Sequence, residues 1–245
     1  MTSVQAPAKL TRSLRVVGVR DDGYHLLDAE VVALDLADEL RIMTAGTGVT
    51  VTGPFAAGVP VDDANLVVRA LAAVGRKAAV QLDKQIPHGA GLGGGSADAA
   101  AVLRWAGVSD LGLAASLGAD VPCCLVGGRV RMRGIGEVID ALPFEPLVVT
   151  LVVPPVVVST PAVYRAWDEL GGPRGEGSND LEGAALTVEP ELRAWRERIG
   201  EATGAAPVMA GSGSAWFVLG DRTDVLEGLR DDGAFVRLAR AVDRS

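Results

Sequence analysis

Apolar residues recur along the chain at two different spacings, and each spacing predicts one kind of element. In the first half they alternate with polar residues or form short runs, a pattern typical of half-buried strands. Turn-forming glycines at Gly23, Gly46 and Gly48 separate these runs. Between the last two predicted strands, Asn65 caps an apolar helical face that ends at Gly75. The predicted strands cover residues 13–20, 27–34, 39–43, 49–52 and 78–82.

The second half of the chain mixes helical and extended patterns. Residues 97–105 are rich in strong helix formers, and Ser96 just before them is a natural N-cap. A β-branched run over residues 147–153 predicts a buried strand. After it, helical patterns at 161–170, 180–186 and 190–202 alternate with predicted strands at 215–219 and 235–238. The pattern indicates a protein of mixed α and β structure, and the change of character near residue 146 predicts two domains, residues 1–145 and 146–245.

Composition and charge exclude several classes of protein. Hydrophobic residues make up 49% of the chain. A helix needs about 18 uninterrupted apolar residues to cross a bilayer, and every stretch of that length contains a charged residue, Gly or Pro. Lys9, Arg12 and Arg15 interrupt any secretory signal near the start. The net charge of −8 disfavours a general binder of nucleic acid, which needs clustered cations. We therefore expect a cytoplasmic protein with neither a membrane nor a nucleic acid as partner.

A glycine-rich stretch over residues 87–100, PHGAGLGGGSADAA, runs directly into the predicted helix 97–105. Glycines let backbone N–H groups converge on an anion, and a helix N-terminus adds positive potential, so the stretch predicts a phosphate-binding loop. The plainer alternative is a flexible turn that caps a helix. Gly89, Gly91 and Gly94 also match a dinucleotide-binding pattern, although the stretch does not open a βαβ unit. No Gly-Lys-Ser/Thr ends it, which excludes a Walker A loop.

This loop resembles the ATP-binding motif of the galactokinase, homoserine kinase, mevalonate kinase and phosphomevalonate kinase (GHMP) superfamily, Pro-x-x-x-Gly-Leu-Gly-Gly-Gly-Ser. Further segments stand in the order found in the 4-diphosphocytidyl-2-C-methyl-D-erythritol kinase family, so the resemblance covers essentially the whole chain. These segments are Ala6-Pro7-Ala8-Lys9, Asp22-Gly23-Tyr24-His25-Leu26-Leu27, Leu117-Gly118-Ala119-Asp120-Val121-Pro122, Ser178-Asn179-Asp180-Leu181-Glu182 and Gly211-Ser212-Gly213-Ser214.

The resemblance implies a fold and an activity. The fold is the α+β fold of the GHMP kinases, with a ribosomal-protein-S5-like N-terminal domain for ATP binding and catalysis and a ferredoxin-like C-terminal domain. The activity is ATP-dependent phosphorylation of the 2-hydroxyl of 4-diphosphocytidyl-2-C-methyl-D-erythritol, a step of the non-mevalonate isoprenoid pathway. Its implied cofactors are ATP and Mg²⁺, and its partner is a cytidine-diphosphate-linked sugar alcohol.

The resemblance also assigns roles to residues at matching positions. Asp120 corresponds to the catalytic base and Lys9 to a catalytic lysine beside it, although Asp120 alone could cap a turn and Lys9 alone could be an ordinary strand lysine. Ser96 corresponds to the loop serine that touches phosphate or Mg²⁺. The residues expected to bind ATP are Pro87, Gly89, Gly91, Leu92, Gly93, Gly94, Gly95, Ser96 and Ala97.

The acceptor is expected to contact Thr11, Tyr24, His25 and Tyr164. The two tyrosines could stack on the cytosine and His25 could pair with its edge, while each aromatic could otherwise be a residue at the edge of the core. Thr11 stands where the family usually has Asn. The chain departs from the family also at Cys123 and Cys124, which occupy positions that are commonly aromatic. Because these cysteines are adjacent, we interpret them as small core residues.

Three other functions fit parts of the pattern. A different GHMP kinase, acting on homoserine or mevalonate, would share the loop and the catalytic pair. A non-catalytic nucleotide-binding module would keep the fold without turnover. An NAD-dependent oxidoreductase would use the dinucleotide-binding spacing. For the kinase we expect a monomer or a weak homodimer.

Overall fold

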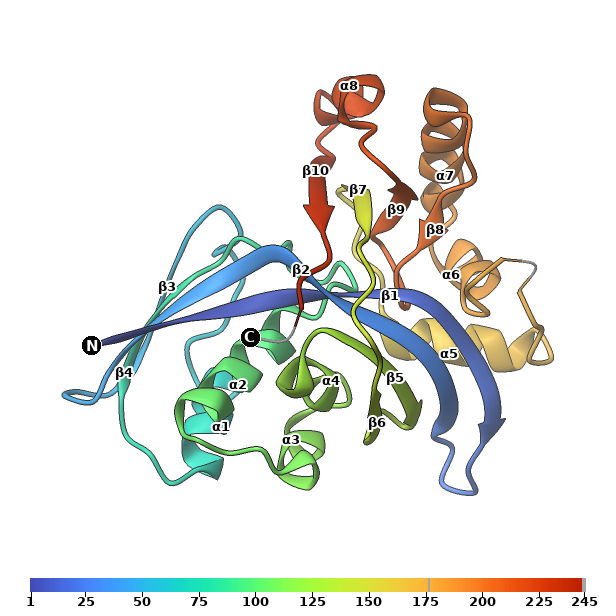
Figure 1. Cartoon of the computed structure of the whole chain (residues 1–245). Helices are drawn as coiled ribbons and strands as arrows, with labels where there is room; N and C mark the ends of the chain where they lie inside the picture. The colour runs from blue at the N-terminus through green and yellow to red at the C-terminus, as the bar shows by residue number, and fades with distance from the viewer. Residues whose placement is uncertain (176, 244–245) are drawn as a thin grey trace.

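The computed structural model describes residues 1–175 and 177–243, and two β-sheets covered by helices form its frame (Figure 1). The first sheet has the strand order β3-β4-β2-β5-β6, with β1 paired to β2. Helices α1 to α4 lie beneath β1 and β2 in Figure 1, with α2 packed against both strands. The strands of this sheet are β1 (Thr2–Val19), β2 (His25–Met43), β3 (Gly48–Thr52), β4 (Ala79–Asp83), β5 (Arg129–Gly134) and β6 (Val138–Ala141).

Two long antiparallel strands dominate the first sheet, where the sequence predicted shorter pieces. The predicted strand 13–20 covers only the end of β1, and the predicted strands 27–34 and 39–43 are parts of the single strand β2. The two strands pair from Thr2↔Ile42 to Val19↔His25, and this pairing keeps both of them extended even where polar residues interrupt the apolar pattern. The predicted turn is confirmed, since the Gly23 N–H donates to the Arg20 carbonyl at 2.9 Å.

The helices of the first half are α1 (Leu66–Ala73), α2 (Gly94–Trp105), α3 (Leu111–Leu117) and α4 (Val121–Val126). Asn65 caps α1 as predicted, with its Oδ1 accepting from the Val67 N–H. The prediction that Ser96 caps α2 is wrong. Gly93 takes the cap position with φ 68°, a conformation that turns the chain into the helix early and leaves Ser96 in the first turn. Four elements of this half, α3, α4, β5 and β6, were not predicted from the sequence.

The second sheet has the order β10-β7-β9-β8 and stands above the first in Figure 1. The predicted helix at 180–186 begins later, because Asn179 Oδ1 accepts from the Leu181 N–H and forms a turn before it. The other elements predicted here are present with small shifts. The full set is β7 (Val148–Val153), β8 (Val208–Met209), β9 (Trp216–Leu219), β10 (Phe235–Arg240), α5 (Thr160–Glu169), α6 (Glu182–Val188), α7 (Glu191–Thr203), α8 (Thr223–Leu226) and the 3₁₀ turn η1 (Glu227–Arg230).

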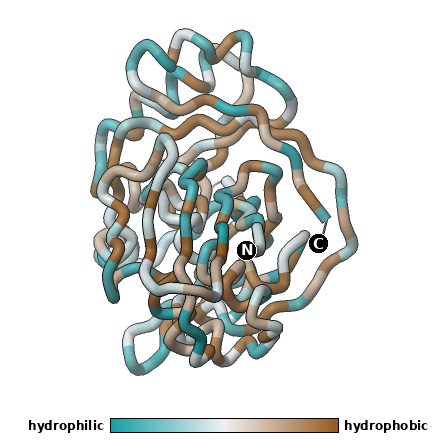
Figure 2. The backbone as a smooth tube through the Cα atoms, turned by 90° about the vertical axis from the view of Figure 1, so that its left-hand side faces the viewer, coloured by the Kyte–Doolittle hydropathy of each residue, from teal (hydrophilic) through white to brown (hydrophobic). Residues whose placement is uncertain are grey.

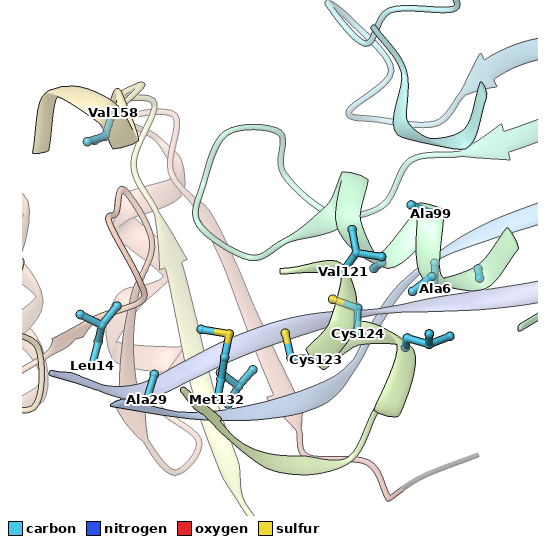
Figure 3. Packing of buried hydrophobic residues seen from close by; sticks show 14 of the residues in the cluster. Ala6, Leu14, Ala29, Ala99, Val121, Cys123, Cys124, Met132 and Val158 are labelled. Carbon is cyan, nitrogen blue, oxygen red and sulfur yellow. The ribbon is translucent and has the colours of Figure 1, made fainter. Parts of the chain in front are cut away.

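Both sheets contribute to one interior, and the α+β class is confirmed. Each of the two clusters of buried apolar residues draws members from the two sheets, for example Val80 with Val152 and Leu34 with Leu151. Buried and more exposed positions alternate along much of β2, and short hydrophobic and hydrophilic stretches follow one another along the backbone (Figure 2). The prediction that Cys123 is a core residue is confirmed, and both cysteines lie with Val121 among buried apolar residues (Figure 3).

Candidate active site

Two clefts open beside the glycine-rich loop and meet at one carboxylate. The large cleft has a volume of about 800 Å³, and the loop cleft, which runs along residues 87–96, has a volume of about 380 Å³. Gly91, Ser96, Asp120 and Thr160 line both of them. A ligand in one cleft can therefore reach a ligand in the other next to Asp120.

The Asp120 carboxylate is directed to Lys9 and not to its own helix. Asp120 stands at the N-cap position of α4, yet its side chain makes no capping hydrogen bond. Lys9 Nζ lies 3.2 Å from Asp120 Oδ2, and the Asp120 side chain keeps 34% of its surface exposed. The Cys123 thiol donates to the Asp120 carbonyl at 3.1 Å and holds the start of the helix in place.

Lys9 is a buried ammonium in β1. Register shifts on both sides of it, between Pro7 and Lys9 and between Thr11 and Ser13, mark bulges that re-aim side chains. Burial alone would lower the pKa of Lys9, but the adjacent Asp120 carboxylate more than compensates, so the net pKa lies above the ordinary value. Lys9 Nζ also donates to Thr11 Oγ1 at 3.2 Å, which brings the three predicted residues together.

The glycine-rich loop is tied to both sheets. The Lys9 N–H donates to the Leu92 carbonyl at 3.0 Å, and the Ala215 N–H donates to the Ala90 carbonyl at 3.1 Å. A β-carbon on Gly91 would lie 2.6 Å from the Ala210 carbonyl oxygen, so the second glycine segment, residues 211–214, can pack against the loop only because residue 91 is glycine.

The predicted ATP-binding residues divide into two groups. The side chains of Leu92 and Ala97 are buried and do not line the loop cleft, so these residues can offer a ligand only their backbone. The other predicted positions line the cleft: Pro87, Gly89, Gly91, Gly93, Gly94, Gly95 and Ser96. The free N–H groups of the first turn of α2 belong to this second group.

The neighbours that a β-carbon would meet differ from one loop glycine to the next. A β-carbon on Gly93 would lie 2.6 Å from Lys9 Cγ, and one on Gly94 would lie 3.1 Å from Lys84 Nζ. At both positions a β-carbon would meet a lysine side chain of the protein itself. Gly95 is exposed, and a β-carbon there would meet only Leu66 Cδ1 at 3.7 Å.

A cluster of buried charged residues lies under the loop, and no pattern in the sequence predicted it. Lys84 Nζ donates to Asp38 Oδ2 and, at 2.7 Å, to Asp98 Oδ2. All three residues are at most 3% exposed, and Asp98 Oδ1 has no partner among the described residues. Burial, opposed by Lys84 and reinforced by Asp38, raises the pKa of Asp98 to about 7. No local pattern marks the cluster, since its members come from β2, the end of β4 and α2.

The three predicted acceptor-binding aromatics line the large cleft. The rings of His25 and Tyr164 lie 4.7 Å apart at 33°, whereas Tyr24 is 59% exposed. Burial, and after it the negative charge of Asp120, raises the pKa of the Tyr164 phenol above its ordinary value. Sequence reasoning missed Asp168, whose Oδ1 lies 2.8 Å from His25 Nε2.

Within residues 1–175 and 177–243, every helix is shorter or more polar than a bilayer-spanning helix must be. In the same part of the chain, His, Cys, Asp and Glu side chains form no group of three or more placed to hold a metal ion by themselves.

Known proteins resemble this chain over most of its length. Residues 65–128 match the family described as "GHMP kinases N terminal domain". The 4-diphosphocytidyl-2-C-methyl-D-erythritol kinase of Paracoccus denitrificans is 42% identical, and the alignment covers 87% of this chain and 85% of that protein. The enzyme of the same name from a Jannaschia species is 44% identical, over 87% of each chain.

The fold agrees as well. A crystal structure of a 4-(cytidine 5'-diphospho)-2C-methyl-D-erythritol kinase superposes with a TM-score of 0.78 at 35% identity, over 98% of this chain and all of that one. A crystal structure of a mevalonate kinase, at 11% identity, shares the fold with a TM-score of 0.57. The chain therefore belongs to the 4-diphosphocytidyl-2-C-methyl-D-erythritol kinase family of the GHMP kinases and is an ATP-dependent small-molecule kinase.

Proposed function

We propose that this kinase transfers the γ-phosphate of ATP to the 2-hydroxyl of 4-diphosphocytidyl-2-C-methyl-D-erythritol, in the non-mevalonate isoprenoid pathway. One observation carries the proposal: the loop cleft and the large cleft meet at Asp120, beside the buried ammonium of Lys9. Phosphoryl transfer needs a donor phosphate and an acceptor hydroxyl held together next to a proton acceptor. The names of the relatives support this choice of acceptor.

Asp120 is the proposed base. As the acceptor oxygen forms its bond to the γ-phosphorus and the bond to the departing ADP breaks, the hydroxyl proton passes to the Asp120 carboxylate. Lys9, which stays charged, stabilises that carboxylate beforehand and the negative charge that develops on the phosphoryl group. Thr11 orients Lys9 through its hydroxyl and borders the acceptor.

The ATP phosphates are proposed to bind the backbone N–H groups of the loop and the first turn of α2, where the helix dipole favours anions. Ser96 and the nucleotide phosphates would hold Mg²⁺, which neutralises phosphate charge when bound. A site with few protein ligands suits Mg²⁺, because this ion usually keeps several waters and substrate oxygens. Ser96 lines both clefts, so its hydroxyl is available as a ligand where the two meet.

The cytosine is proposed to bind in the large cleft between Tyr24 and Tyr164, with its edge at His25.

Both clefts are formed by one chain, so a monomer or weak homodimer suffices for activity. We keep residues 1–145 as the N-terminal ATP-binding and catalytic domain and 146–245 as the C-terminal domain. The cytoplasm, which supplies ATP, is the proposed compartment.

The test is an ADP-release assay with ATP, Mg²⁺ and a panel of acceptors: 4-diphosphocytidyl-2-C-methyl-D-erythritol, homoserine and mevalonate. We expect turnover only with the first, and mass and ³¹P spectra of the product should place the new phosphate on the 2-hydroxyl. The Asp120→Asn variant, purified in parallel, gives the background from contaminating kinases. Preference for homoserine or mevalonate would contradict the proposal, as would ATP binding without turnover or a dependence on NAD.

A further inference from the structure

One face of α5 encloses the His25 ring. Tyr164, Trp167 and Asp168 are spaced i, i+3 and i+4, and side chains at this spacing share a helix face. Tyr164 packs on the imidazole at 4.7 Å between ring centroids, and Trp167 meets it edge-on at 5.5 Å and 82°. Asp168 Oδ1 lies 2.8 Å from His25 Nε2. Only 10% of the His25 side chain remains exposed, so the ring is held in one orientation.

The Asp168 carboxylate determines which ring nitrogen carries the proton. An ionised carboxylate can only accept hydrogen bonds, so its partner Nε2 must be the protonated nitrogen. In a neutral imidazole the other nitrogen, Nδ1, then has a lone pair and acts as an acceptor. Because His25 lines the large cleft, Nδ1 is the ring nitrogen left for a ligand there. A ligand that presents an N–H group fits this nitrogen, whereas one that presents a carbonyl oxygen is repelled.

Cytosine and uracil differ at this kind of contact. Cytosine carries an exocyclic amino group, a donor, where uracil carries a carbonyl oxygen, an acceptor. We propose that Asp168 is a positioning residue that keeps His25 protonated on Nε2, so that Nδ1 accepts from the cytosine amino group and the kinase selects cytidine over uridine diphosphate compounds. This inference rests on the proposed function, which places the base of the acceptor beside His25.

Asp168→Asn tests the inference, because an amide can accept from Nε2–H through its oxygen or donate to a bare Nε2 through its nitrogen. The tautomer is then no longer imposed. Glu169→Gln is the matched control: it removes the same charge from an exposed neighbour on the same helix. Asp168→Glu restores the carboxylate.

The measurement is calorimetric titration with CDP and with UDP while a non-hydrolysable ATP analogue fills the loop cleft. A ratio of the two affinities cancels any general effect of the charge change on the diphosphate. We expect wild type, Glu169→Gln and Asp168→Glu to prefer CDP, and Asp168→Asn to reduce the preference by about tenfold, as one lost discriminating hydrogen bond would. KM for the acceptor should rise in Asp168→Asn while kcat changes little, because Asp120 and Lys9 are untouched.

Imidazole ¹⁵N spectra at pH 8 read the tautomer directly, since the chain has only two histidines and His88→Gln assigns them. The Nε2-protonated form should dominate in wild type, and Asp168→Asn should show a larger share of the Nδ1-protonated form. An unchanged CDP-to-UDP ratio in folded Asp168→Asn would overturn the role of Asp168, even if the kinase phosphorylates its cytidine acceptor normally. Failure of the proposed function is a distinct result: wild type would then neither bind CDP in the large cleft nor phosphorylate the cytidine acceptor.

Discussion

Asp120 lies at a helix start without capping it, and this geometry leaves its carboxylate available for chemistry. We expect Asp120→Asn to keep the size and much of the polarity of the side chain but to lose the basic oxygen. Turnover should fall on the order of a hundredfold or more, while ATP and acceptor affinities change little. Single-turnover transfer at saturating ligands, with separate titrations of each ligand, distinguishes these effects.

Lys9→Met removes the ammonium that faces Asp120 and should also slow transfer. The double variant should lose less than the product of the two single effects, because paired catalytic groups act as a unit. A thermal melt confirms that each variant is folded. Near wild-type single-turnover rates in folded Asp120→Asn would mean that the base lies elsewhere.

Asp98 is the second residue whose protonation can be tested. Its pKa of about 7 lies above its ordinary unfolded value of 3.8, so the folded state holds a proton that the unfolded state releases. The contribution of Asp98 to wild-type stability should therefore decrease as pH rises from about 4 to about 7. Asp98→Asn keeps an oxygen for Lys84 and removes this titration, so its unfolding free energy relative to wild type should rise over the same window, on the order of 3 kcal/mol.

Urea unfolding of Asp98→Asn between pH 4 and pH 8 measures the effect. Asp63→Asn is the control, since Asp63 is exposed and the substitution removes the same charge. A constant difference between Asp98→Asn and wild type across the window would show that Asp98 is ionised throughout, in which case Lys84 compensates both carboxylates.

The glycine-rich loop and α2 form the element on which ATP binding is proposed to depend. Gly95 is the second residue of α2, and a valine there should be tolerated by the fold, because a β-carbon meets only Leu66 at van der Waals distance. Its side chain would enter the loop cleft, which Gly95 lines. We expect Gly95→Val to weaken ATP binding at least about tenfold, that is, by about 1.4 kcal/mol or more.

Gly183→Val is the matched control for this change. Gly183 is likewise the second residue of a helix, α6, and a β-carbon there has no neighbour within 4 Å. Calorimetry with an ATP analogue should show wild-type affinity for Gly183→Val and weakened binding for Gly95→Val. Equal affinities in two folded variants would contradict the assignment of the loop cleft to ATP.

At the scale of the whole molecule, the buried Asp180 carboxylate joins β1 to the C-terminal half through an ion pair with the partly exposed Arg15. Asp180, whose side chain is fully buried, accepts from Arg15 Nη1 at 2.6 Å, from the Val16 N–H at 3.0 Å and from the Gly175 N–H at 2.9 Å. Asp180→Asn would remove the negative charge that faces Arg15 and, because an NH₂ group replaces one carboxylate oxygen, would leave at least one of these donors without an acceptor. We expect a loss of about 2–4 kcal/mol of unfolding free energy.

Because both apolar clusters include residues of the two sheets, the chain should unfold in a single transition. Tryptophan fluorescence and far-UV circular dichroism should therefore give coincident urea curves. Asp232→Asn, in an exposed pair with Arg198, should cost less than about 0.5 kcal/mol. Two separated transitions would indicate instead that residues 1–145 and 146–245 fold independently.

The sequence by itself determined the features that depend on local chemistry. The Asn65 cap, the turn at Gly23, the β-branched strand β7 and the glycine-rich approach to α2 are each encoded within a few neighbouring residues. The same holds for the motifs by which the family is recognised. Lys9 and Asp120 could be named from these motifs, but their neighbours in the sequence showed neither that Lys9 is buried nor that the Asp120 side chain makes no capping hydrogen bond.

Only the tertiary structure decided the features that join distant segments. Pairing with β1 joins the two strands predicted at 27–34 and 39–43 into the single strand β2. The packing of β2, β4 and α2 brings Asp38, Lys84 and Asp98 together in the interior. The contact of His25 with Asp168 spans 143 positions. Such contacts have no period and no local spacing, because they follow from how buried surfaces match once the sheets assemble.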